Sequence, residues 1–245
     1  MEKNKGCIYY TDGRQLDPPI YQIVQDCIKE SGLPITSVSL RPMDFGRNFV
    51  LDRGRSMYTM VLQIIKALEE SKEDNVFFCE HDVLYHKTHF DFTPPRDDTY
   101  YYNTNVWRWR YHSDVVVTYD NPVSLSSLCC NRELALSHFK FRKKIIEDNK
   151  WDMEYTRETS WSRHMGYEPG FKKRGYLPDE KWEMWQSDYP IIDIRHRFCT
   201  TNRKTKMEEF RAKPTGWIET TPELISGWNI LELFSKYNVI PYIKS

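Results

Sequence analysis

The chain has 245 residues, of which 40% are hydrophobic and 29% charged, a composition typical of a globular protein with a sizeable core. Lysine plus arginine equals aspartate plus glutamate at 35 each, which argues against a global field that draws the protein onto nucleic acid or anionic lipid. The cysteines form no Cys-X-X-Cys pair, and no apolar run has the length of a membrane span or the context of a signal peptide. We therefore expect a soluble, intracellular protein of the cytoplasm.

Residues 1–85 alternate between strand-like and helix-like patterns. The pattern predicts strands at 7–10, 35–40 and 76–79, helices at 19–31 and 57–68, and a loop at 41–54. This order indicates βαβ units. The expected fold class is therefore α/β, with a mostly parallel central sheet flanked by helices in a single domain.

The later elements are less regular. Within 99–110, Trp107 and Trp109 share one face of a predicted strand, while Arg108 and Arg110 share the other. The tryptophan face suits a sugar-stacking platform, and equally a strand packed on both sides. Further elements are predicted as a strand at 114–119, a helix at 131–149 and a strand at 191–196, with 150–190 unassigned. We expect residues 206–245 to form a helix and tail packed on a domain of residues 1–205.

Two carboxylates flank a histidine at the end of the third predicted strand. In an extended chain Glu80 and Asp82 project to one side and His81 to the other. Paired oxygen ligands suit Mg²⁺ or Mn²⁺, although an isolated triplet of this kind is more often the polar start of a loop. Here it shares the carboxyl edge of the predicted parallel sheet with Thr11 and Asp12, where ligands bind in such folds.

No dinucleotide fingerprint and no P-loop occurs in the sequence, so bound phosphates would need the metal. This order of features resembles the GT-A fold glycosyltransferases, which use sugar nucleotides and commonly a divalent metal. Over roughly residues 6 to 205 the chain looks like a group of small glycosyltransferase-like proteins from bacteria and viruses, with Glu-His-Asp in place of Asp-X-Asp. The similarity is carried by residues 79–85, 95–108 and 192–196.

The resemblance implies roles for individual residues. Asp82 would bind an Mn²⁺ or Mg²⁺ ion bridging the diphosphate, Glu80 would contact the ribose, the metal or its water shell, and His196 would match a late metal-binding histidine. Contacts to nucleoside and phosphates would come from Thr11, Asp12, Arg14, Arg47, Asn48, Arg55 and Ser56. The implied partners are a nucleotide-sugar donor and an acceptor hydroxyl. A glycan acceptor is favoured over nucleic acid, and a modified nucleic-acid base is the alternative for a viral source.

An inverting transferase also needs a carboxylate that removes the acceptor proton. Glu154, Glu158 and Glu168 lie between the Glu-His-Asp stretch and His196. We favour Glu168, because Pro169 and Gly170 place it on a loop, with Glu154 second. A retaining mechanism stays open.

Two other classes of function compete with this hypothesis. A metal-dependent hydrolase would draw its ligands from Glu80, His81, Asp82, His86, His89 and His196. The expected opposite faces of Glu80 and His81 weaken it. A non-catalytic module would use the aromatic residues to bind carbohydrate, with nucleic acid disfavoured by the zero net charge.

Overall fold

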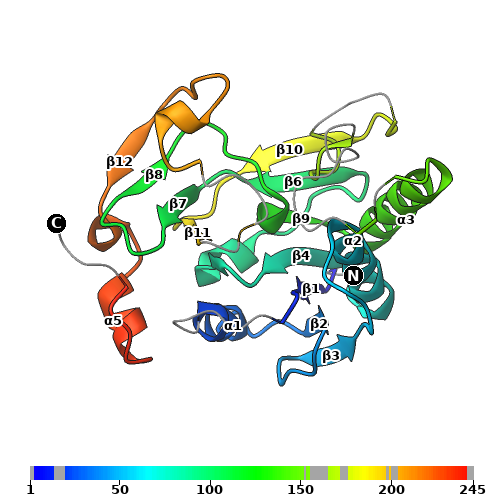
Figure 1. Cartoon of the computed structure of the whole chain (residues 1–245), viewed down its shortest axis with the longest axis horizontal. Helices are drawn as coiled ribbons and strands as arrows, with labels where there is room; N and C mark the ends of the chain where they lie inside the picture. The colour runs from blue at the N-terminus through cyan, green and yellow to red at the C-terminus, as the bar shows by residue number, and fades with distance from the viewer. Residues whose placement is uncertain are drawn as a thin grey trace.

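A computed structural model of the chain describes residues 3–13, 20–151, 153–154, 165–171, 176–196, 199 and 204–241. Two sheets form the framework of the molecule (Figure 1). In spatial order the seven-stranded sheet contains β10 (Lys181–Trp185), β6 (Thr99–Asn103), β9 (Leu128–Asn131), β4 (Asn75–Glu80), β1 (Lys5–Tyr10), β2 (Ile35–Ser39) and β3 (Arg47–Val50). The five-stranded sheet contains β12 (Ile218–Thr220), β8 (Val116–Thr118), β7 (Val106–Arg110), β11 (Ile191–Arg195) and β5 (Val83–Leu84).

The α/β fold with a mostly parallel central sheet is confirmed. β1 is parallel to both β2 and β4, and β2 is parallel to β3, whereas β9 is antiparallel to both of its neighbours. The helices are α1 (Ile20–Lys29), α2 (Met57–Glu70), α3 (Arg132–Asp148) and the short α5 (Ile230–Ser235). Short 3-10 turns lie at Lys87–Asp91, Leu125–Ser127, Met207–Glu209 and Pro222–Leu224.

The alternation of side chains along β1 divides the core into two layers. Cys7 and Tyr9 face α1, the five-stranded sheet and α5, whereas Ile8 and Tyr10 face α2 and α3. Both faces of the central strands are therefore covered, and β4 is a continuous apolar run as such burial requires. Each fully buried large apolar side chain contributes about 1.5–3 kcal/mol relative to an exposed one. The two layers hold the carboxyl ends of β1 and β4 in fixed positions.

Side-chain caps set where two helices begin. The Ser56 hydroxyl accepts a hydrogen bond from the Thr59 backbone N–H at 2.9 Å and starts α2. The Asn131 side chain accepts from the N–H groups of Glu133 and Leu134 and starts α3. The first cap lies at the same edge of the sheet as the end of β1, because Gln63 of α2 donates to the Thr11 carbonyl oxygen at 2.6 Å.

Several elements differ from the sequence-based expectations. The predicted loop at 41–54 contains β3, and β9 and β10 were not predicted. The predicted strand at 99–110 is two strands, β6 and β7, which belong to different sheets. Trp109 is fully buried and packs at 5.5 Å between ring centroids against Phe234 of α5, so the sugar-stacking platform is wrong and the strand is packed on both sides.

Two elements of the carboxyl-terminal part belong to the five-stranded sheet. β12 extends this sheet by pairing with β8, and α5 covers its apolar face.

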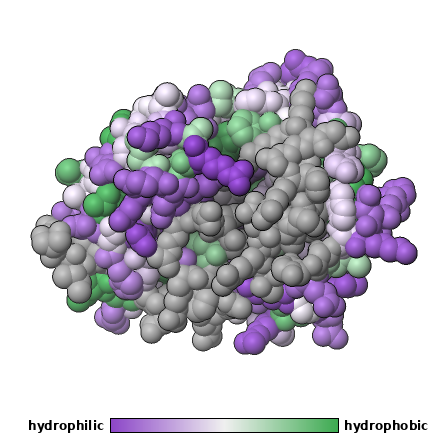
Figure 2. All heavy atoms as spheres, turned by 45° about the horizontal axis from the view of Figure 1, so that its top comes forward, coloured by the Kyte–Doolittle hydropathy of each residue, from purple (hydrophilic) through white to green (hydrophobic). Residues whose placement is uncertain are grey.

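On the face shown in Figure 2, hydrophobic residues form small separate patches among hydrophilic ones. Among the helices of the described residues, none has both the length and the apolar character needed to cross a bilayer.

Candidate active site

The chain passes from one sheet to the other at His81 and Asp82. β4 ends at Glu80, β5 begins at Val83, and the Asp82 carbonyl oxygen accepts a hydrogen bond from the Ile194 N–H of β11 at 2.8 Å. These two residues form a turn, so the alternation of an extended strand does not apply to them. The expectation that His81 points away from Asp82 is therefore wrong, and the two side chains converge.

His81, Asp82 and His196 form a cluster of potential metal ligands. One ligand atom of each lies within 4.8 Å of the others. His196 Nε2 lies 3.2 Å from Asp82 Oδ2, and Cys199 Sγ lies 3.6 Å from the same oxygen. Burial alone raises the pKa of Asp82, but the neighbouring His81, His196 and Arg195 outweigh burial and hold that pKa well below its usual range. Asp82 is therefore an ionised carboxylate facing two imidazole groups.

Glu80 lies beside this cluster in a different environment. The Tyr10 hydroxyl donates to Glu80 Oε1 at 2.7 Å, and the Glu80 backbone N–H donates to the Tyr85 hydroxyl at 3.0 Å. Burial, and then the charge of Asp82, raise the pKa of Glu80 to about 8. At neutral pH, Asp82 is therefore ionised, whereas Glu80 is mostly protonated. Among the described residues, Glu80 is outside the group whose ligand atoms converge.

A cavity of about 120 Å³ opens in front of this turn. Its lining includes six residues that the sequence nominated for the glycosyltransferase, namely Thr11, Asp12, Arg55, Ser56, Glu80 and Asp82, and also His81 of the hydrolase hypothesis. Arg55 Nε lies 2.6 Å from Asp12 Oδ2, which ties the chain before α2 to the end of β1. The cavity is therefore lined by the Arg55 guanidinium group and by two of the three residues of the potential metal cluster, His81 and Asp82.

A second cavity of about 280 Å³ lies on the other side of Thr11. Its lining combines the aromatic rings of Tyr9 and Tyr21 with polar groups of Gln25, Arg41 and Asp44. Thr11 lines both cavities, so the end of β1 lies between the cavity beside Asp82 and a second one that adds aromatic and amide groups.

Arg47 and Asn48 are not among the residues that line either cavity. Arg47 lies 3.9 Å from Glu70 and over the Phe49 ring. The Asn48 amide donates to the hydroxyls of Ser37 and Ser39, both at 2.9 Å, and its oxygen accepts from the Met43 N–H at 3.3 Å. The Asn48 side chain thus joins β2, β3 and the segment between them. Arg14 lies outside the described residues.

The two favoured base candidates have different surroundings. Glu168 is 8% exposed, and its charge acts on the pKa of Arg142 and of Arg108. Glu154 is exposed, and Glu158 lies outside the described residues. Glu168 is therefore the candidate with a buried, charged environment.

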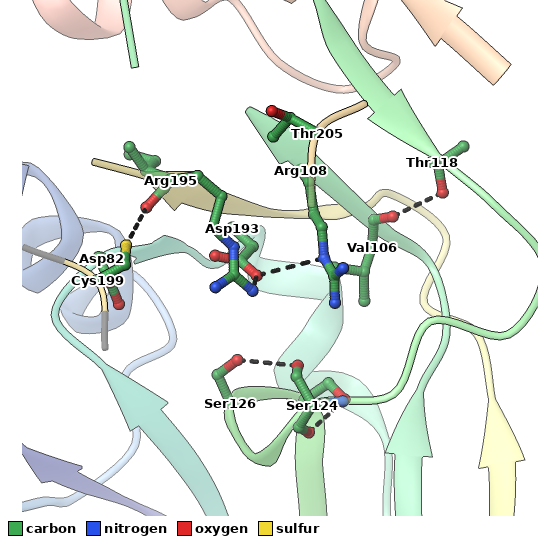
Figure 3. Close-up of polar contacts among 12 residues, drawn as sticks. Asp82, Val106, Arg108, Thr118, Ser124, Ser126, Asp193, Arg195, Cys199 and Thr205 are labelled. Carbon is green, nitrogen blue, oxygen red and sulfur yellow. Dashed lines mark hydrogen bonds and ion pairs between the residues drawn. The ribbon is translucent and has the colours of Figure 1, made fainter. Parts of the chain in front are cut away.

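The polar face of the five-stranded sheet adds charged residues that the sequence did not nominate (Figure 3). Register pairs Arg108 with Asp193, and Arg195 follows two residues later on the same face of β11. Asp193 Oδ2 accepts from Arg195 Nη2 and lies 3.8 Å from Arg108 Nε. Arg195 also influences the pKa of both Glu80 and Asp82. The Trp-Arg-Trp-Arg and Ile-Asp-Ile-Arg alternations mark this face in the sequence.

The additional histidines of the hydrolase hypothesis lie elsewhere. His89 is fully buried, its Nδ1 lies 3.0 Å from Asn103 Nδ2, and its ring stacks on Trp185. His86 contacts the rings of Tyr189 and Trp228. Neither histidine is in the converging cluster of the described residues.

Comparisons with known proteins found no matching family model and no matching curated protein. Among solved structures, the chain is similar to a glycosyltransferase involved in the glycosylation of the major capsid of PBCV-1, at 8% sequence identity. The match covers 75% of this chain and 82% of that chain, with a TM-score of 0.42. A likeness this distant carries no argument about function, which has to be inferred from the residues of this chain.

Proposed function

We propose that this protein is a metal-dependent glycosyltransferase that moves a sugar from a nucleotide-sugar donor to an acceptor hydroxyl with inversion. The observation that carries the proposal is the converging His81–Asp82–His196 cluster at the edge of a cavity that also holds Arg55. In an α/β fold this edge, at the carboxyl ends of parallel strands, is where ligands bind.

The donor set of the cluster favours Mn²⁺ over Mg²⁺. Two imidazole groups join one carboxylate, and nitrogen ligands suit transition-metal ions, whereas Mg²⁺ is bound by oxygen ligands. His81, Asp82 and His196 would hold the ion, and its chemistry would be to neutralise charge on the diphosphate. Glu80, hydrogen-bonded by Tyr10, would contact the ribose or the water shell of the ion.

The nucleotide would lie along the end of β1. The second cavity, with Tyr9, Tyr21 and Gln25, offers aromatic surface and amide groups for a base, and Thr11 joins it to the cavity beside Asp82. Asp12 holds Arg55 in place at 2.6 Å, so the Arg55 guanidinium group is positioned for the diphosphate. Ser56 stands beside it at the start of α2, where N–H groups and the helix dipole favour an anion.

The reaction would break the bond between the anomeric carbon and the diphosphate oxygen and form a bond to the acceptor oxygen. Negative charge would develop on the leaving diphosphate, where Arg55 stabilises it. Glu168 would accept the proton of the acceptor hydroxyl. Its burial beside Arg142 keeps a carboxylate away from bulk water.

A metal-dependent hydrolase is the second candidate. The expected placement of His81 on the opposite face of a strand weakened this hypothesis, but the His81 side chain converges with those of Asp82 and His196. Three protein ligands of mixed type are also a common catalytic metal site in hydrolases. Such an enzyme would need no nucleotide, which separates it from the transferase.

Calorimetric and thermal-shift screening against nucleoside diphosphates and sugar nucleotides, with and without Mn²⁺, tests the proposal. We expect stabilisation by a nucleotide only when Mn²⁺ is present. Stabilisation by Mn²⁺ with no response to any nucleotide would favour the hydrolase and refute the transferase.

A further inference from the structure

Arg108 is a buried cation whose hydrogen-bonding capacity is largely unused. The residue is 7% exposed, and within the described part of the chain its Nε and Nη1 atoms have no hydrogen-bond partner. Its contacts are the carboxylate of Asp193, at 3.8 Å, and the face of the Tyr119 ring, at 5.1 Å from the guanidinium carbon. Burying a charged group with unmade hydrogen bonds is destabilising. A bound ligand that accepts these hydrogen bonds would offset this cost.

The carboxylate nearest to Arg108 also binds a second guanidinium group. Arg108 and Arg195 share one carboxylate, that of Asp193, through the same oxygen atom. Glu168 is a further carboxylate nearby, and its charge raises the pKa of both Arg142 and Arg108. Two guanidinium groups thus compete for Asp193, and its Oδ2 hydrogen bond goes to Arg195.

Two serine hydroxyls lie on the side of the sheet to which these arginines point. Figure 3 shows the guanidinium groups of Arg108 and Arg195 directed toward the turn that carries Ser124 and Ser126. β9 begins directly after this turn, and its Cys129 and Cys130 pair with Phe77 and Val76 of β4. The arginines and the serines therefore lie on the same side of the five-stranded sheet, and Arg195 is close enough to Glu80 and Asp82 to influence the pKa of both.

We propose that Arg108, together with Arg195, Ser124 and Ser126, forms an anion subsite that binds a carboxylate or phosphate monoester group of an acidic acceptor. A guanidinium fork binds either group in a bidentate manner, and a serine hydroxyl rotates to donate to an oxygen atom. The inference deepens the proposed function, on which it rests, by naming the chemical class of the acceptor. The anion would fix the acceptor on the polar face of the five-stranded sheet, beside the buried carboxylate of Glu168.

Calorimetric titration of the metal-free protein with inorganic phosphate and with glucuronate tests the subsite and separates the two anion sources. We expect at least one probe to bind wild type, and Arg108→Gln to weaken that binding about 10- to 100-fold, the loss typical of charge-assisted hydrogen bonds. Arg110→Gln is the matched control, because Arg110 lies on the same face of the same strand, and it should bind as wild type does.

Three results would overturn the proposal. They are no binding of either probe to wild type, equal binding by wild type and Arg108→Gln, and loss of binding in Arg55→Gln with retention in Arg108→Gln. The last result would assign the anion to the cavity beside Asp82. Neither metal nor nucleotide is needed, so the outcome is independent of whether the nucleotide screen succeeds.

A measurement on the wild-type protein removes the dependence on folding of the variants. We expect the Nε–H resonance of Arg108, assigned by NMR through its own side chain, to shift as the binding probe is added. A resonance that stays in place while the probe binds would show that the anion lies elsewhere.

Discussion

His89 makes the stability of this protein depend on pH in a way that can be calculated. Its ring is fully buried among aromatic side chains, and burial lowers its pKa from 6.5 to about 3. The unfolded chain therefore takes up a proton at His89 between these two values, while the folded chain does not. Stability from this residue is complete above pH 6.5 and falls as the pH is lowered toward 3.

The size of the effect follows from the two pKa values. With an unfolded pKa of about 6.5, moving from pH 8 to pH 5 lowers the free energy of unfolding by about 2 kcal/mol through His89 alone. The substitution His89→Gln removes the titrating group and keeps an acceptor for the Asn103 amide, which lies 3.0 Å from His89 Nδ1. The variant should be less stable at pH 8 because the aromatic packing is lost.

Urea unfolding of wild type and His89→Gln at pH 8 and pH 5 measures this difference. We expect the loss of stability between the two pH values to be smaller in the variant by about 2 kcal/mol. Other titrating groups contribute equally to both proteins and cancel. Identical pH dependence in both proteins would refute the assignment of a buried, neutral His89.

Four substitutions test the roles assigned to single residues. Glu168→Gln should lower kcat about 10²- to 10⁴-fold, as expected for a lost general base. Glu154→Gln should have a kcat close to that of wild type in the same turnover assay. The opposite result would make Glu154 the general base. Asn48→Ala should lower the free energy of unfolding by about 1–3 kcal/mol with an unchanged nucleotide Kd, and a raised Kd would instead place Asn48 in the binding site. Trp109→Phe should also lower the free energy of unfolding by about 1–3 kcal/mol, because the indole N–H donates to the Ser113 carbonyl oxygen at 2.8 Å. Loss of carbohydrate binding with unchanged stability would instead support the sugar-stacking platform.

The first half of the fold was accessible from the sequence because its periodicities are local. Apolar residues at helical spacing in α1 and α2, and the apolar run of β4, determine their own conformation and burial. β3, β9 and β10 are short strands whose pairing with distant partners decides their existence, and such pairing leaves little periodicity in the sequence.

The candidate site was accessible only in part for the same reason. Thr11, Asp12 and Glu80 follow predicted strands, so their common edge could be inferred from the order of elements. The convergence of His81 with Asp82 depends on a turn between two sheets, which strand alternation does not predict. The Arg108–Asp193 pairing depends on the register of β7 and β11, which lie far apart in the chain.

The central claim is that His81, Asp82 and His196 bind a divalent metal, and that a nucleotide binds only when this metal is present. Isothermal calorimetry of Mn²⁺ binding, with and without a nucleoside diphosphate, tests it in wild type, Asp82→Asn and the exposed control Asp188→Asn. We predict that Asp82→Asn weakens Mn²⁺ binding by more than about 10- to 100-fold, the loss seen when only a hydrogen-bond partner of a metal ligand is removed. Asp188→Asn should bind as wild type does, and Mn²⁺ affinity that is equal in all three proteins would contradict the account.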